Sequence, residues 1–475
     1  MNAKFSKIGF ILAVAGSAVG LGNAWKFPTM VGQNGGIGFI LLYLLLTLIV
    51  GLVIFLAELS IGKLSEKDPV NAYKTLAPSY KNLWGFAGFS MIGAILIVSF
   101  YSLVIGWIVK YTLISFSSLP DDIKQSGELF QNFMSEDFTS QFFCFLFVFI
   151  LMFYIVSKGI KNGIERLNVW LMPILFILLL FMLLYSMSFS GFEKAYHFLI
   201  FPELSTIKEL GFFEAVFGKI NENSVLSALG LAFFSLSLGV GTIITYSASL
   251  PDKTNFIQAS LVIIFINILI GIMMGFVVFT YVFEFGGEVS QGPGLIFVSL
   301  TTLFSNLGSF GNVLAVCFFI SLFFAGITSA VSMIEPFALY LINTYNFTRK
   351  KALAYIAIVV FVLGVLCILS FMSFTNGSLI FFGSKSVFDI LDYLSSNIIM
   401  PIGGFCAAVF VGFIMKKEGL KILFSPYMND FFFSLWYFFL RYISPLAIII
   451  VVINQIYPQL FAYIFAYLKA LFIFT

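Results

Sequence analysis

Long apolar runs follow one another along almost the whole chain, separated by short polar segments. A helix of about 20 apolar residues crosses the hydrocarbon core of a bilayer, so each run of this length predicts a membrane span. The pattern predicts eleven spans, at residues 8–30, 36–62, 87–114, 139–157, 164–188, 224–250, 256–284, 312–342, 350–371, 387–414 and 431–457. A last apolar stretch, 460–475, contains Lys469 and is short for a span, which leaves a hydrophobic tail or an incomplete twelfth helix.

Small and polar residues interrupt the first span at a depth where a membrane helix is usually apolar. The stretch Gly16–Pro28 contains three glycines together with Asn23 and Lys26. Backbone inside a bilayer leaves the helix only where it is buried in protein or lines a cavity. Freed carbonyls can bind a cation, and the start of the next half-helix attracts an anion. The stretch therefore predicts a broken helix at an ion and solute site; close helix packing, the alternative, does not explain Asn23 or Lys26.

The sixth span has a similar interruption between Ala232 and Ile243. Two glycines and three hydroxyl residues break the apolar run there: Ser235, Ser237, Gly239, Gly241 and Thr242. Two broken spans, five apart, are typical of two five-helix repeats, and because five is odd the second repeat is inverted. We expect the binding site between the two breaks, near the membrane midplane.

The predicted fold is thus an all-α polytopic membrane protein of about eleven transmembrane helices, with discontinuous first and sixth helices. The first five-helix repeat is expected at residues 1–190 and the second, inverted repeat at 191–415. Residues 416–475 hold the eleventh span and the hydrophobic C-terminal tail.

The composition agrees with a membrane protein and excludes several functions. Hydrophobic residues make up 60% of the chain and charged residues 10%, whereas about a quarter of a soluble protein is charged. The net charge of +3 is too small to predict a nucleic-acid partner, and nothing in the sequence signals an oligomeric state. The single histidine and four scattered cysteines leave no arrangement for zinc binding or catalysis, so we do not expect an enzyme: His197, Cys144, Cys317, Cys367 and Cys406.

Basic residues concentrate in the loops on one side of the predicted spans. Positively charged loops stay in the cytoplasm, which places the N-terminus there and the chain in the inner (plasma) membrane as a multi-pass protein. The basic residues of these loops are Lys4, Lys7, Lys63, Lys67, Lys74, Lys81, Lys158, Lys161, Arg166, Lys253, Arg349, Lys350, Lys351, Lys416, Lys417 and Lys421.

Three long connections lie on the opposite side. Those near 115–138 and 189–223 are long enough for short helices of their own. The third, near 285–311, begins with a glycine-rich segment and turns amphipathic through Leu295, Phe297 and Leu300, which fits a hairpin capping a vestibule or an ordinary surface loop.

The stretch Gly16–Pro28 resembles the first-helix signature of the neurotransmitter:sodium symporter family, in its bacterial amino-acid transporter branch, which is typified by the bacterial leucine transporter. The similarity covers nearly the whole chain. It continues through Asn34-Gly35-Gly36, Glu58, Tyr101, Gly106-Trp107, Phe233–Gly241, Asn267, Gly275-Phe276, Ala325–Ser329, Phe388–Gly404 and Arg441–Pro445.

The resemblance implies two sodium sites built from oxygen ligands, which hard cations prefer. The first would use the Ala18 carbonyl and the side chains of Asn23, Ser235 and Asn267, with the substrate carboxylate as a shared ligand. The second would use carbonyls and hydroxyls of five residues: Gly16, Val19, Ala325, Thr328 and Ser329. Back-bonding of Thr328 and Ser329 to a helix carbonyl is the alternative for these two hydroxyls.

The resemblance also implies a substrate pocket between the first, third, sixth and eighth spans. Tyr101 would donate its hydroxyl to a substrate carboxylate, helped by N–H groups at the first break. Gly20 stands where monoamine transporters carry an aspartate, so it leaves room for the carboxylate of an amino acid. The predicted lining residues are Ser17, Ala18, Gly20, Gly22, Ile97, Tyr101, Phe234, Ser237, Val240, Gly241, Ser332 and Met333.

These features predict sodium-coupled symport of a hydrophobic or aromatic amino acid into the cell by alternating access. Tyr101 and Phe234 would close the pocket, below an outer gate between Lys26 and Asp392, where the family usually has an arginine instead of the lysine. The inner gate must differ from that of the leucine transporter, because Asn343 replaces its aspartate.

Several alternatives stay open at this point. Gly271 occupies the position that decides chloride dependence, so chloride coupling is not assigned. Glu58 is expected to bond to first-helix backbone, with proton transport as the rival role. A binding-only sensor and a passive channel are rival functions for the chain as a whole.

Overall fold

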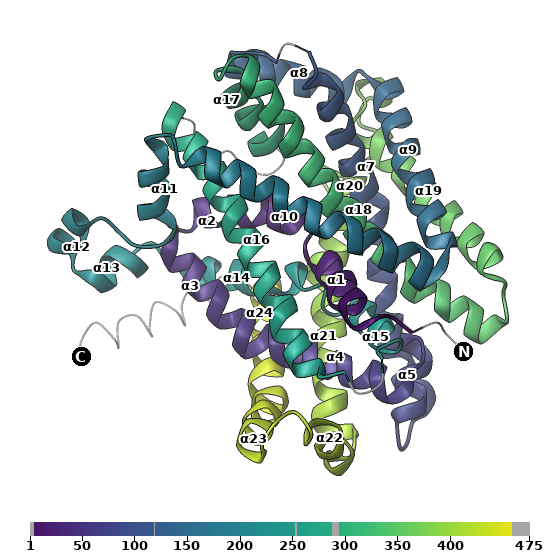
Figure 1. Cartoon of the computed structure of the whole chain (residues 1–475). Helices are drawn as coiled ribbons and strands as arrows, with labels where there is room; N and C mark the ends of the chain where they lie inside the picture. The colour runs from purple at the N-terminus through teal and green to yellow at the C-terminus, as the bar shows by residue number, and fades with distance from the viewer. Residues whose placement is uncertain (1–3, 118, 252–253, 287–293, 458–475) are drawn as a thin grey trace.

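The computed structural model describes residues 4–117, 119–251, 254–286 and 294–457 as a bundle of helices (Figure 1). The predicted C-terminal tail and most of the glycine-rich start of the third long connection lie outside these residues. Nine helices of the described part are long and apolar enough to cross a membrane, or ten if one bent pair counts as a single span. The predicted all-helical membrane fold is confirmed.

The bent pair is the first span. Helix α1 (Lys7–Ala18) ends at Val19, and a π-helical turn (Gly22–Lys26) leads into α2 (Phe27–Gln33). The two halves meet at 52°. The predicted break is therefore present, three residues after Gly16.

The sixth span is broken as well, into α14 (Glu222–Ser235) and α15 (Thr242–Ser247), each too short to cross a bilayer alone. Between them Ser237, Gly239 and Gly241 have positive φ values of 53°, 78° and 76°. A Cβ at Gly239 would overlap the backbone carbonyl of Met400, so this position requires glycine for its φ and for close packing on the tenth span.

The other spans are either single helices or helices with one or two tight turns inside. The single helices are α9 (Phe138–Ser157), α10 (Arg166–Ser186, after a π-helical turn Ile160–Glu165), α16 (Phe256–Phe285), α18 (Ser309–Tyr345) and α19 (Arg349–Phe371). The interrupted ones are α3 (Ile37–Leu46) with Thr47–Gly51 and α4 (Leu52–Ser65); α6 (Lys81–Ala87) with Gly88–Met91 and α7 (Ile92–Ile114); α20 (Val387–Asp392) with Tyr393–Ile399, α21 (Met400–Val409) and Phe410–Ile414; and α23 (Asp430–Phe438) with Phe439–Ile443 and α24 (Ser444–Ile456).

Side-chain caps fix where several of these helices begin. Ser6, Asn255 and Thr348 each accept a hydrogen bond from a backbone N–H of the first turn, in α1, α16 and α19. The caps satisfy backbone groups that would otherwise be unpaired at the helix ends.

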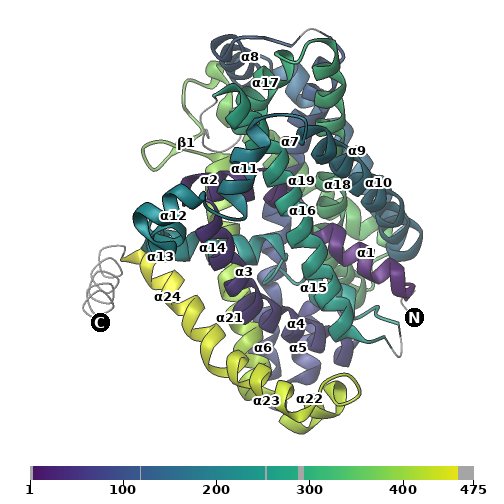
Figure 2. The ribbon, with the colours of Figure 1, turned by 60° about the vertical axis from the view of Figure 1, so that its left-hand side comes forward.

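The connections form short elements at the two ends of the bundle. They are α5 (Pro69–Leu76), α8 (Ile123–Ser135), α11 (Gly191–Leu199), α12 (Leu204–Leu210), α13 (Phe212–Phe217), a π-helical turn (Leu295–Leu300) with α17 (Thr301–Ser305), a 3-10 turn (Ser373–Thr375), the antiparallel strands β1 (Ile380–Phe381) and β2 (Lys385–Ser386), and α22 (Lys417–Phe424). Helices α8 and α17 lie at one end, and α22 and α23 at the other, in both views (Figure 1, Figure 2).

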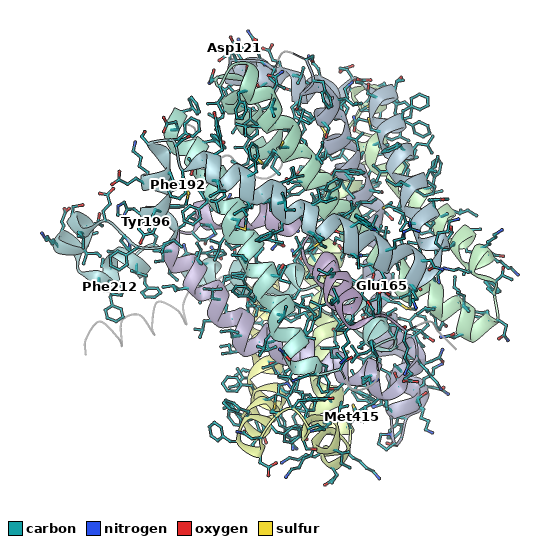
Figure 3. All side chains as sticks on the ribbon, in the orientation of Figure 1. Asp121, Glu165, Phe192, Tyr196, Phe212 and Met415 are labelled. Atoms are coloured by element: carbon teal, nitrogen blue, oxygen red, sulfur yellow. The ribbon has the colours of Figure 1, made fainter. Side chains whose placement is uncertain are left out.

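Loops predicted on opposite sides of the membrane lie at these opposite ends. Asp121 and Met415 mark the two ends in Figure 3. The third long connection is not a surface loop, because Leu295, Phe297 and Leu300 are fully buried and Thr302 donates to Ser126 of α8 over 2.6 Å. The repeat boundaries at 190 and 415 remain a prediction.

Helix α1 lies at the centre of the bundle, in contact with α10, α16 and α18. Helix α7 packs against α9, α18 and α19. Helix α15 of the sixth span packs on α4 and α18, so both broken spans contact α18.

We predict that Gly239→Ala lowers the unfolding temperature of the purified protein by several degrees. Overpacking costs about 1–3 kcal/mol, and a left-handed backbone adds ~1–2 kcal/mol for a residue with a Cβ. Gly230→Ala, in helical backbone of the same span with no atom near the new methyl group, is the matched control and should leave it unchanged or slightly higher. Equal effects of the two substitutions in a thermal unfolding assay would contradict this explanation of Gly239.

Candidate functional site

The two helix breaks are bound to each other at the centre of the molecule. The Ser17 carbonyl accepts hydrogen bonds from the hydroxyls of Ser237 (2.9 Å) and Ser329 (3.1 Å). The Ser17 hydroxyl lies 2.8 Å from that of Ser332. Freed backbone of the first span is therefore satisfied by hydroxyls of the sixth and eighth spans.

A narrow cavity of about 10 Å³, roughly the space that one water molecule needs, lies beside this contact. It is lined by Ala18, Gly20, Gly22, Ile97, Tyr101, Phe234, Ser237, Val240, Ser329, Met333 and Met400. Nine of the twelve residues predicted for the substrate pocket are in this lining.

Three predicted pocket residues lie outside the lining. Ser17 and Ser332 bond to each other, and a Cβ on Gly241 would meet Pro69 and Met91, outside the cavity lining. Met400 was missed because nothing distinguishes it in sequence from other apolar residues of the tenth span. Ser329 was expected only as a sodium ligand. Its hydroxyl donates a hydrogen bond to the Ser17 carbonyl of the first span.

Tyr101 connects the third span to the first break. Its side chain is 3% exposed, and its hydroxyl accepts a hydrogen bond of 2.7 Å from the N–H of Leu21. The hydroxyl proton is therefore free to be donated to an anion. A Cβ on Gly20 would lie 2.5 Å from the Tyr101 oxygen, so any side chain at this position would displace the donor.

The side chains predicted for the first sodium site form one buried cluster. The Asn23 amide donates to the backbone carbonyl (2.8 Å) and the side-chain oxygen (2.9 Å) of Asn267. Ser235 bonds to the hydroxyl of Tyr43 at 3.0 Å, a neighbour that the sequence did not indicate. Among the described residues, the buried Asn23 Oδ1 has no hydrogen-bond partner, which fits an oxygen that binds a cation.

The residues predicted for the second sodium site meet on the other side of the first break. A Cβ on Gly16 would lie 3.2 Å from the Cβ of Thr328. The Thr328 hydroxyl donates to the carbonyls of Phe324 (2.8 Å) and Ala325 (3.1 Å), which is the back-bonding geometry considered above. Such a hydroxyl still has lone pairs for a cation, so the ligand role of Thr328 stays a prediction.

The residues predicted for the outer gate are in contact. Lys26 Nζ lies 3.2 Å from Asp392 Oδ1 and 3.8 Å from the centre of the Phe234 ring. Ser396 also donates to Asp392, over 2.9 Å. The lysine therefore contacts its acid directly and holds the aromatic ring that covers the cavity.

The opposite end is closed by the segment before α1. Lys4 pairs with Glu66 at 3.4 Å, and the Phe5 N–H donates to the Ser249 carbonyl over 3.1 Å. The Phe5 ring also packs on Tyr246, with ring centres 5.4 Å apart.

Asn343, which stands where the leucine transporter has its gate aspartate, also forms a contact at this end. It donates to Asp68 over 2.9 Å and so joins the end of α18 to the loop before α5. The amide of Asn343 therefore pairs with an acid of this loop.

Contrary to our expectation, Glu58 does not bond to the first-helix backbone. Its Oε1 accepts a 2.7 Å hydrogen bond from the N–H of Gly239, so the acid binds the broken sixth span and not the first. The error arose because the two breaks are adjacent in space, and sequence does not show which of them faces the second span.

Comparisons with known proteins agree with this geometry. The model of the sodium:neurotransmitter symporter family matches residues 2–140 and 122–470. The chain is 34% identical over 456 residues to the uncharacterized sodium-dependent transporter YhdH of Bacillus subtilis (strain 168), covering 95% of this chain and 97% of that protein. An uncharacterized sodium-dependent transporter of Haemophilus influenzae is 32% identical over 465 residues, covering 95% and 97%.

One solved structure is similar over its whole length. The crystal structure of MhsT in complex with L-phenylalanine matches with a TM-score of 0.83 at 32% identity. The match covers 96% of this chain and 100% of that one.

We predict that Glu58→Ala destabilises the protein by about 1–3 kcal/mol, because the buried Gly239 N–H loses its acceptor. Glu58→Gln keeps an acceptor oxygen and should lose less than half as much. Thermal unfolding of both variants tests this. An equally large loss for glutamine would show that the charge of Glu58, and not its hydrogen bond, is what the sixth span requires.

Proposed function

Because the chain belongs to the sodium:neurotransmitter symporter family and is therefore a sodium-coupled symporter of the membrane, we propose that its substrate is a hydrophobic amino acid. In this proposal the substrate enters the cell together with sodium by alternating access. Symport of this kind requires no catalytic residues.

The observation that carries the proposal is the donor arrangement around Gly20. The Tyr101 hydroxyl accepts from Leu21 N–H, so its proton can be donated, and the absence of a side chain at Gly20 lets this hydroxyl lie against the first-span backbone. A carboxylate placed there would accept from Tyr101 and from N–H groups at the start of the second half-helix. Free amino acids carry such a carboxylate, whereas monoamines do not.

The rest of the cavity supports an apolar side chain. Ile97, Phe234, Val240 and Met333 line it, and Met400 adds a flexible apolar surface. MhsT, whose structure has L-phenylalanine bound, shares this fold, which supports an aromatic or other large side chain here.

We place two sodium ions beside the cavity. The first would be bound by the Ala18 carbonyl and by Asn23, Ser235 and Asn267, where Asn23 Oδ1 is buried without a partner among the described residues. The second would be bound between Gly16, Val19, Ala325, Thr328 and Ser329. A substrate carboxylate next to the first ion would make the binding of each favour the other.

Alternating access fits the contacts at both ends. Lys26, Asp392 and Phe234 close the cavity on one side, and Phe5 with Ser249 closes the other. Opening one end breaks only a few polar contacts at a time. The broken first and sixth spans would move against α7, α9, α18 and α19, with the N-terminus in the cytoplasm and the chain in the inner membrane.

The proposal predicts that a few hydrophobic amino acids raise the unfolding temperature of the purified protein in sodium chloride but not in potassium chloride. A ligand that binds only the folded state stabilises it by mass action. All twenty amino acids are compared in both salts. Equal shifts in potassium would contradict sodium coupling at the first site, and no shift with any amino acid would contradict the substrate class.

Tyr101→Phe should weaken amino-acid binding about tenfold or more, since a hydrogen bond to a charged group contributes about 1.5–3 kcal/mol. Tyr111→Phe is the matched control, because Tyr111 is buried in the same helix and its hydroxyl has no partner among the described residues. Titrations in sodium measure both. Equal affinities in the two variants would rule out Tyr101 as the carboxylate donor.

A further inference from the structure

Asn168, near the start of α10, has a buried amide oxygen that is not satisfied within the described part of the chain. The side chain is 0% exposed, and its Nδ2 donates to the carbonyl of Ile164 over 2.8 Å. That bond fixes the orientation of the amide, because turning it over would place two oxygens against each other. Oδ1 therefore points away from its own helix, without a partner among the described groups.

The free oxygen faces the first helix break. A Cβ added to Gly16 would overlap Asn168 Oδ1 and would lie 3.2 Å from the Cβ of Thr328. Since Gly16 has no side chain, the amide oxygen lies directly against its backbone. Three spans thus meet at one point, with α1 in contact with both α10 and α18.

A second polar contact joins this region to the start of α1, although the Oε2 atom of its acid, Glu165, is also buried without a partner among the described residues. Glu165, one turn before Asn168, accepts hydrogen bonds through Oε1 from the Ser6 N–H (3.2 Å) and the Ser6 hydroxyl (2.6 Å). Figure 3 shows Glu165 beside the start of α1. The contact of Glu165 secures the start of α1, whereas the Asn168 oxygen lies against Gly16 in its last turn, directly before the break.

Leaving a buried amide oxygen unpaired is unfavourable, and a nearby cation removes the penalty. Sodium takes neutral oxygens of this kind as ligands. We infer, on the basis of the second sodium site proposed above, that Asn168 Oδ1 is an additional oxygen donor to the sodium ion bound between Gly16 and Thr328. The fifth span, which supplied no ligand in the sequence-based set, then contributes to sodium affinity.

A packing role is the competing explanation, in which the amide oxygen only accepts a weak hydrogen bond from the Gly16 Cα–H. The two roles differ in what they change. Packing affects stability alone, whereas a ligand affects the sodium concentration at which the amino acid stabilises the protein.

The experiment measures the sodium concentration for half-maximal stabilisation by a saturating amino acid in the full-length protein. Asn168→Leu, similar in size but without oxygen, should raise this concentration about tenfold. Asn168→Asp keeps the oxygen and adds a negative charge, so it should need no more sodium than the wild type. Leu175→Ala, a buried substitution further along the same helix, is the control and should lower stability with an unchanged sodium requirement.

Three outcomes would overturn the inference. The inference is wrong if the sodium concentration for half-maximal stabilisation of the Leu variant lies within twofold of the wild-type value. If the Leu variant does not fold, an Asp variant that needs clearly more sodium than the wild type would do the same. If the amino acid stabilises the wild-type protein equally with and without sodium, both the proposed function and this inference are wrong. The two failures are therefore distinguishable.

Discussion

Backbone that leaves a helix inside a membrane needs new hydrogen-bond partners, and the centre of this protein is built around that requirement. The Ser17 carbonyl receives hydroxyls from Ser237 and Ser329. The N–H of Leu21 donates a hydrogen bond to Tyr101 on the third span, and the N–H of Gly239 donates one to Glu58 on the second. The freed backbone groups are thus bonded to side chains of the second, third, sixth and eighth spans.

The same requirement explains why a transport site can form here. Groups that satisfy a broken helix are polar, buried and fixed, and these are the properties that a small ion or a carboxylate needs in its binding site. Tyr101 illustrates this, because its hydroxyl oxygen accepts a hydrogen bond from Leu21 N–H while its proton can be donated to a ligand. The apolar cavity wall around it then limits what the rest of a substrate can be.

The closures at the two ends are weak by comparison. Lys26 with Asp392, and Lys4 with Glu66, are ion pairs between partly exposed side chains, and exposed ion pairs contribute little to stability. Contacts of this size can be broken and remade during a transport cycle. The hydrogen bonds at the two helix breaks are buried, whereas these two ion pairs are partly exposed.

Much of the fold could be read from the sequence, because interrupted apolar runs are a local signal. Both breaks were found in this way from glycines and polar residues such as Asn23 and Ser237. The ligand sets came from the family resemblance, and the cavity contains most of the pocket residues among them.

Contacts between distant spans could not be predicted. Met400 and Tyr43 lack any local signal, and Glu58 was assigned to the wrong break. Asn168 has no local signal either, since only the packing of α10 against Gly16 reveals its unpaired oxygen.

The most direct test of sodium-coupled amino-acid transport is uptake into liposomes that contain the purified protein. The probe is the radiolabelled hydrophobic amino acid that stabilises the protein most. With sodium outside and potassium inside, it should accumulate above its external concentration and leave again when an ionophore collapses the sodium gradient. Uptake that stops at equal concentrations, or that is the same with potassium on both sides, would contradict coupled transport.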